Sequence, residues 1–240
     1  MYTFGASVNA WSAYNPEMIL YTFLPILLFS DTLFLKWYHV KGAFWQCLLL
    51  AFPGVVIGSF FLGGITKKLP LGWSWNLCMA FGYIITATDS VAVSATLANL
   101  GASPKLVMIM AGESLLNEGS AYVLFTLYKS LLEHESYTSY GLFDFIMRIV
   151  FVSPIVGCLF GLVSVWWMKQ LKRQYNEHDV LIQVIITITC AYASFYTANY
   201  VMKISGVLSC CAAGLMFAWK APPLILEPET MHRVWEVLEW

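Results

Sequence analysis

Two short polar stretches contain the residues of this chain that could carry chemistry. The first, TATDSV at residues 86–91, sets hydroxyl groups beside a carboxylate. The second, GESLLNEGS at residues 112–120, contains two glutamates and an asparagine. Both stretches interrupt long apolar runs. Carboxylate, hydroxyl and carbonyl oxygens are ligands for hard cations rather than for soft metals, so the pattern predicts the binding of a hard cation.

The spacing within the second stretch separates its two glutamates. Asn117 lies four residues after Glu113, so these two side chains share one face of a helix. Glu118 lies five residues after Glu113, which at 3.6 residues per turn places it roughly 140° around the helix. Glu118 shares its own face with Ser114. One glutamate can therefore hold a structural partner while the other lines a cavity.

The composition predicts that these residues lie in a membrane. The chain has 240 residues, of which 59% are hydrophobic and 11% are charged, whereas about 25% of a soluble domain is charged. A membrane β-barrel would show short alternating segments, but here the apolar runs are long and continuous. We therefore expect an all-α integral membrane protein in contact with lipids. The net charge of −1 argues against a nucleic-acid partner.

Seven apolar segments predict about seven transmembrane helices. They lie at about residues 16–35, 43–66, 75–99, 105–132, 142–170, 179–202 and 205–220. Most suit the roughly 20 residues that a helix needs to cross a bilayer. Residues 221–240 are more polar and are predicted to form a linker that leads into an unfinished next helix.

Three carboxylates fall inside these spans, namely Asp89, Glu113 and Glu118. Each charge at bilayer depth costs at least about 2.5–3.5 kcal/mol, so these side chains must face protein, water or ions. An alternative is that they are structural groups, satisfied by hydroxyls and a basic partner, and for Glu113 we favour this interpretation. Residues 86–90 are weak helix formers, which predicts a local break. The freed carbonyls of a broken membrane helix can coordinate cations.

The stretches TATDSVAVSATLANLGASPKL and GESLLNEGSAYVLF, in this order, closely resemble the paired signatures of the monovalent cation–proton antiporters. Among these sodium/proton exchangers, the plant plasma-membrane salt-tolerance type is nearest. The resemblance extends over nearly the whole chain. It implies an inverted-repeat fold with a broken helix near residues 86–90, a plasma-membrane location and a homodimer. It also implies that residues 1–220 are a partial exchanger domain, because family members have further helices at both ends.

The resemblance assigns ion-binding roles to five residues. Asp89 matches the acid of the broken-helix motif, and the carbonyl of Thr88 beside it would face the ion. Asn117 and Glu118 match an Asn-Asp pair, with glutamate in place of the usual aspartate. Ser114 matches a neighbouring hydroxyl ligand. Asp89 and Glu118 would hold the transported sodium ion transiently.

Other positions match structural residues of the family or depart from its pattern. Glu113 matches a glutamate that forms an ion pair with an arginine of a later helix, which is not in this chain. Ser90 stands where family members usually have proline. Ser30 replaces a glutamate that is common near the site. The adjacent Asp31 is either an outer-shell substitute for that glutamate or an interfacial acid, and we favour the second interpretation.

The implied activity is secondary active exchange of a monovalent cation for protons, which serves pH and salt homeostasis. Sodium is expected ahead of potassium or lithium, and no cofactor or catalytic residue is needed. Glu118, together with Asp89, would bind either the cation or a proton, because burial raises the pKa of a carboxylate. Two alternatives remain open. One is an intramembrane hydrolase in which two acids share a proton, and the other is a membrane scaffold without transport activity.

Overall fold

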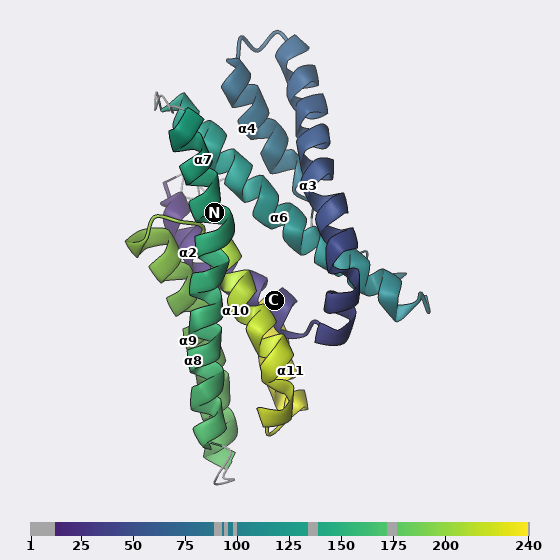
Figure 1. The fold of residues 1–240 in the computed structure, drawn as a ribbon, viewed down its shortest axis with the longest axis vertical. Helices are drawn as coiled ribbons and strands as arrows, with labels where there is room; N and C mark the ends of the chain where they lie inside the picture. Colours follow the sequence, from purple (N-terminus) through teal and green to yellow (C-terminus); the bar gives the residue numbers. More distant parts are fainter. Residues whose placement is uncertain are drawn as a thin grey trace, which may run out of the picture.

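The computed structural model describes residues 13–88, 93, 96, 97, 100–133, 139–171 and 177–239. In this part of the chain the regular secondary structure is all helical. No strand occurs in these residues, and each of the seven predicted spans contains a helix (Figure 1). The elements, in chain order, are α2 (Pro16–Leu33), α3 (Trp37–Lys68), α4 (Trp75–Thr86), α6 (Pro104–Leu132), α7 (Ser139–Met147), the π-helical turn η1 (Arg148–Val152), α8 (Ser153–Leu171), α9 (Glu177–Tyr196), the π-helical turn η2 (Thr197–Val201), α10 (Gly206–Lys220), the 3-10 turn η3 (Pro222–Leu224) and α11 (Pro228–Glu239). The predicted all-α fold is therefore confirmed.

Several of these helices have the length and composition of membrane spans. Three described segments are long and apolar enough to cross a membrane: Val40–Lys68, Phe143–Leu171 and Asp179–Val201. Three shorter apolar helices coincide with α2, α4 and α10. Helix α6 has 29 residues, which is also sufficient at about 1.5 Å per residue. Its two central glutamates distinguish it from the other spans.

The helices pack as two groups (Figure 1). The first group consists of α3, α4 and α6, which all contact one another. The second group consists of α2, α8, α9 and α10, with α10 in contact with each of the other three, and α11 packs on α2 and α9. The two groups meet mainly where α6 approaches α2 and α10. Helix α6 therefore belongs to the first group and also forms its boundary with the second.

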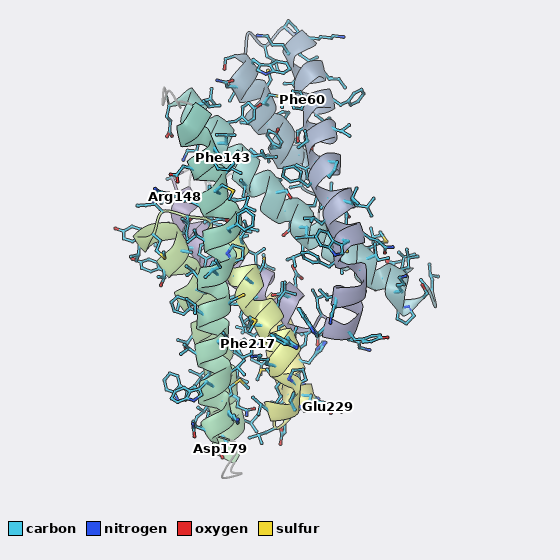
Figure 2. All side chains as sticks on the ribbon, viewed as in Figure 1. Phe60, Phe143, Arg148, Asp179, Phe217 and Glu229 are labelled. Atoms are coloured by element: carbon cyan, nitrogen blue, oxygen red, sulfur yellow. The ribbon has the colours of Figure 1, made fainter. Side chains whose placement is uncertain are left out.

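Large apolar side chains lie on the outside of both groups, as expected for a protein surrounded by lipid. Figure 2 shows Phe60 of α3 and Phe143 of α7 directed outward, and both rings are exposed. Phe217 of α10, in contrast, is fully buried between helices of the second group.

The first group depends on a close crossing of α3 and α4. A Cβ atom added at Gly82 would lie 2.6 Å from the carbonyl oxygen of Ser59. One added at Gly58 would lie 2.9 Å from a methyl group of Thr86. Small residues at helix contacts let membrane helices approach closely. The crossing brings the end of α4, where the site lies, directly against α3.

The segment that was predicted as a linker contains η3 and α11, and α11 is anchored in the second group. The ring of Trp235 is fully buried and stacks on Phe29, with 5.2 Å between the ring centroids. Its indole nitrogen donates a hydrogen bond to the hydroxyl of Thr187 at 3.1 Å. The boundary between an exchanger domain and a linker at residue 220 stays a prediction.

Candidate functional site

Helix α4 ends at Thr86, inside the stretch where the sequence predicted a break. Ala87 follows with an extended backbone, and Thr88 is also outside the helix. The last carbonyls of a helix have no partner within it. Here the side-chain amide nitrogen (Nδ2) of Asn117 donates a hydrogen bond to the backbone carbonyl of Thr86 at 3.4 Å. The hydroxyl of Ser114 donates another to the carbonyl of Thr88 at 3.1 Å.

Helix α3 supports the same end of α4 from the opposite side. The hydroxyl of Thr86 donates a hydrogen bond to the carbonyl of Gly82 at 2.7 Å, one turn back along α4. It also accepts one at 3.2 Å from the hydroxyl of Ser59, a fully buried residue of α3. Ser114 of α6 and Ser59 of α3 thus each donate a hydroxyl hydrogen bond to polar groups at the end of α4. Polar groups at membrane depth need such partners within the protein.

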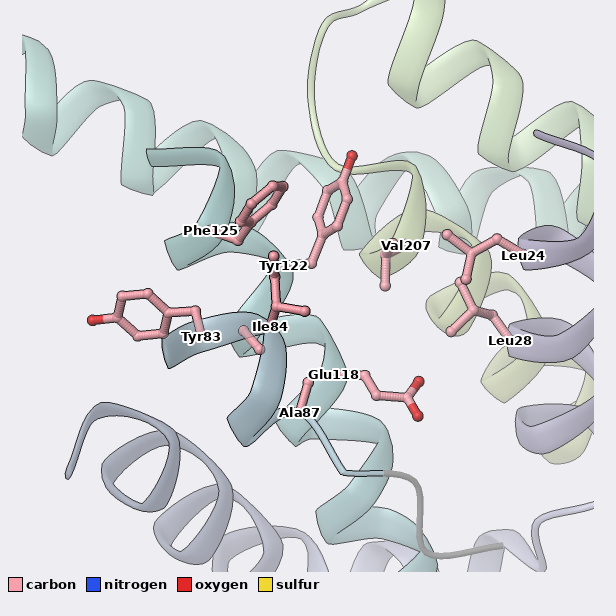
Figure 3. A pocket seen from close by; sticks show the side chains of 10 residues that line it. Leu24, Leu28, Tyr83, Ile84, Ala87, Glu118, Tyr122, Phe125 and Val207 are labelled. Carbon is pink, nitrogen blue, oxygen red and sulfur yellow. The ribbon is translucent and has the colours of Figure 1, made fainter. Parts of the chain in front are cut away.

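Glu118 lines a cavity between the two helix groups. The cavity has a volume of about 330 Å³. Figure 3 shows the Glu118 carboxylate directed away from the end of α4 at Ala87 and toward Leu28 of α2. The side chains around the cavity come from α2, α4, α6 and α10, and they are Leu24, Leu28, Tyr83, Ile84, Ala87, Glu118, Ala121, Tyr122, Phe125 and Val207. Glu118 is the acidic residue among them.

Three of the five predicted ion-binding residues, Thr88, Ser114 and Asn117, meet at the end of α4, and Glu118 lines the adjoining cavity. Ser114 and Asn117 are buried, Glu118 is partly buried and Thr88 is exposed. Ser114 and Asn117 bind the carbonyls at the break, and Glu118 faces the adjoining cavity. Asp89 lies outside the described residues, as does Ser90. The expected meeting of Asp89 with Glu118 therefore stays a prediction.

Two further acids occupy different surroundings. Glu113 forms no ion pair within the described residues, and it interacts electrostatically with Cys47 of α3. Asp31 of α2 is partly buried. Both Asp31 and Glu118 lie in the neighbourhood of Cys211 of α10.

Most of the cavity wall is not apparent from the two polar stretches of the sequence. Tyr122 could have been found, because it lies four residues after Glu118 and therefore on the same face of α6. Leu24, Leu28 and Val207 could not be found in this way, because they come from other helices and only the packing of α2 and α10 brings them to the cavity. Among the described residues, no three His, Cys, Asp or Glu side chains form a metal-binding group. The carboxylate oxygens that line the cavity belong to Glu118.

The helical membrane fold, the end of α4 at Thr86 and the cavity lined by Glu118 beside it define the class of protein as a multi-pass membrane protein with a carboxylate-lined cavity. The family model for "Sodium/hydrogen exchanger, transmembrane" matches residues 2–239. The chain therefore belongs to the sodium/hydrogen exchanger family, and the resemblance drawn from the two polar stretches is confirmed.

Curated relatives agree with this assignment. Sodium/hydrogen exchanger 8 of Arabidopsis thaliana is 34% identical over 238 residues, which cover 97% of this chain and 31% of that protein. Sodium/hydrogen exchanger 7 of the same plant is 33% identical over 98% of this chain and 20% of its own length. The Na(+)/H(+) antiporter NhaP of Pseudomonas aeruginosa is 27% identical over 93% of this chain and 53% of its own. The chain thus spans about a fifth to a half of the length of these relatives.

Proposed function

We propose that this chain supplies the ion-binding half of a secondary transporter that exchanges a monovalent cation for protons. Sodium is the expected cation, because the relatives are named as sodium/hydrogen exchangers and antiporters. The observation that carries the proposal is the position of Glu118. Its carboxylate lines a cavity between two helix groups, beside the end of an interrupted helix.

The chemistry follows from the cost of a charge at this depth. A carboxylate that faces a cavity in the membrane is stabilised when it binds a proton or a cation. Glu118, with Asp89 as the predicted second acid, would therefore hold either sodium or a proton, but not both. The carbonyl of Thr88, the hydroxyl of Ser114 and the amide of Asn117 would supply neutral oxygens, of the kind that hard cations prefer.

Exchange also requires that the site open to each side of the membrane in turn. The two helix groups are suited to such a movement, because each is internally well packed and they meet mainly along α6. Helix α6 contains Glu118, so a displacement of the first group relative to the second would expose the carboxylate alternately. Sodium binding on one side would release a proton there, and the reverse would occur on the other side.

The remaining expectations for the whole protein are part of the same proposal. We propose a plasma-membrane location, a homodimer and a role in pH and salt homeostasis, all on the basis of the family resemblance. We also propose that Glu113 pairs with an arginine of another helix. The absence of a basic partner for Glu113 within the described residues is compatible with this role.

The proposal is tested by measuring sodium-dependent proton movement in vesicles that contain the whole purified exchanger, of which this chain would be the ion-binding half. Glu118→Gln removes the charge and keeps the shape, so exchange should fall to the level of empty vesicles. Glu133→Gln is the matched control, because Glu133 pairs with Lys129 on the exposed end of α6 and should retain full exchange. Exchange that persists in Glu118→Gln would refute the assignment of the site.

A further inference from the structure

A chain of hydrogen bonds crosses the boundary between the two helix groups, close to the cavity. The hydroxyl of Tyr122, on α6, donates to the side-chain oxygen of Asn199 at 3.3 Å. The side-chain nitrogen of Asn199 in turn donates to the hydroxyl of Tyr21, on α2, at 2.8 Å. Asn199 thus uses both ends of its amide, and it connects a helix of the first group to a helix of the second.

Asn199 lies in an irregular and closely packed part of the second group. It belongs to η2, the π-helical turn that follows α9, and π-helical turns are frequent at functional sites. Gly206, the first residue of α10, faces it: a Cβ atom at Gly206 would lie 3.0 Å from the Cβ of Asn199 and 2.9 Å from the carbonyl oxygen of Phe195. This close contact restricts where the amide of Asn199 can lie.

Tyr21 is equally fixed within the second group. Its ring makes an edge contact with Phe195, with 5.8 Å between the centroids, and a tilted contact with Tyr196 at 6.3 Å. Both partners belong to α9. Asn199 and Tyr21 are therefore joined to each other and to α9 within the second group, and Tyr122 attaches to them from α6.

Tyr122 connects this unit to the ion site. It lies one helical turn after Glu118, lines the same cavity, and has its hydroxyl directed away from the carboxylate (Figure 3). Its ring packs against the hydrophobic cluster of the second group. Its neighbours on α6, Ala121 and Phe125, pack instead in the cluster of the first group with Tyr83. Tyr122 thus attaches α6 to the other group through both apolar and polar contacts, whereas the buried Leu115 of α6 contributes apolar contacts to the same cluster.

We propose that Tyr122 is a positioning residue for the Glu118 site, and that its hydrogen bond to Asn199 holds the two helix groups together on this side of the cavity. This inference rests on the proposed function, since a movement of α6 past α9 and α2 during exchange must break the bond. A single neutral hydrogen bond changes such an equilibrium by about fivefold. The bond therefore sets how often the cavity opens, while Glu118 itself binds the ion.

The test compares two tyrosine-to-phenylalanine variants, each of which loses one hydroxyl. Tyr122→Phe removes the bond between the groups. Tyr192→Phe removes a bond within the second group, because the hydroxyl of Tyr192 on α9 donates to the carbonyl of Thr22 on α2 at 2.7 Å. Each change is made in a background that carries Leu24→Cys, a new thiol in the cavity wall on α2. The readout is the rate at which a charged maleimide labels this cysteine, measured on its own peptide.

We expect Tyr122→Phe to raise the labelling rate about fivefold and Tyr192→Phe to leave it unchanged. Asn199→Ala removes the acceptor of the same bond and should raise the rate to a similar extent, which provides a second reading if Tyr122→Phe folds poorly. Equal labelling rates in the Tyr122, Asn199 and Tyr192 variants would overturn the proposal.

The labelling rate does not depend on transport, so the two proposals can fail separately. In vesicles, Tyr122→Phe should raise the maximal exchange rate about fivefold and leave the sodium concentration for half-maximal exchange unchanged. An altered half-maximal concentration at an unchanged maximal rate would overturn the positioning role, because it would place Tyr122 among the ion ligands. Absence of exchange by the unaltered whole exchanger would refute the proposed function alone, and the labelling comparison would still decide on the hydrogen bond.

Discussion

The surroundings of Glu118 differ from those of Glu113, the other glutamate at the centre of α6. The Glu118 carboxylate faces a cavity of about 330 Å³, and Ser114 lies one turn before it on the same face of α6. Ser114 binds the carbonyl of Thr88 just beyond the end of α4. The serine hydroxyl therefore links the carboxylate-bearing helix to the carbonyl oxygens of the interrupted one, where a cation would need them.

Replacing Ser114 with alanine should weaken sodium binding. The change removes a hydroxyl ligand and releases the carbonyl of Thr88 from its partner on α6, and the loss of one neutral hydrogen bond corresponds to about fivefold in affinity. The measurement is the sodium concentration that half-saturates exchange. Ser120→Ala is the control, because the hydroxyl of Ser120 bonds to the carbonyl of Leu116 within α6 itself, and it should leave the value unchanged. Equal effects in both variants would contradict a specific role for Ser114.

At the scale of elements, the crossing of α3 and α4 holds the site helix in place. Gly82→Ala should destabilise the protein by about 1–3 kcal/mol, because the added Cβ would meet the backbone oxygen of Ser59 at 2.6 Å and overpacking has this cost. Gly64→Ala on α3 is the matched control: nothing lies within 4 Å of its added Cβ, and alanine favours a helix over glycine. Thermal unfolding in detergent compares them. Similar melting temperatures for the two variants would show that the crossing is looser than the structure indicates.

Helix α11 gives a second prediction at this scale. Trp235→Ala removes a buried ring that stacks on Phe29 and bonds to Thr187, and such deletions cost about 3–5 kcal/mol. Trp45→Ala on α3 is the control, because the Trp45 ring is 73% exposed and its loss should cost less than about 1 kcal/mol. Chemical denaturation of the two variants in the same detergent measures the difference. An equal loss of stability would mean that α11 is not anchored through Trp235.

The elements themselves were largely predictable from the sequence, because helix length and apolar continuity are local properties. The break near residue 86 was also predictable, since Thr86 and the residues after it are weak helix formers, and α4 does end there. The arrangement of the helices was not predictable in this way. Tyr122 and Asn199 are 77 residues apart in the chain, and no local pattern indicates that they meet. The apolar wall of the cavity likewise depends on how α2 and α10 pack.

In the molecule as a whole, the cavity lies at the boundary between the two helix groups, so a movement of one group past the other would change its access. The first group contains the interrupted helix and Glu118, and the second group closes the cavity through Leu24, Leu28 and Val207. A site at such a boundary is shielded from lipid and can be opened by moving one group past the other. Protein packing within each group favours movement as units over continuous deformation.

Competition between sodium and a proton for the Glu118 carboxylate is measured by the release of protons on sodium binding. Sodium is added to the purified protein in weakly buffered detergent solution, at a pH where the carboxylate is protonated, and the pH change is recorded. We expect about one proton released per sodium ion bound, weaker sodium binding as the pH falls, and no release from Glu118→Gln. Sodium binding without proton release, or the same release from Glu118→Gln as from the unaltered protein, would contradict this competition.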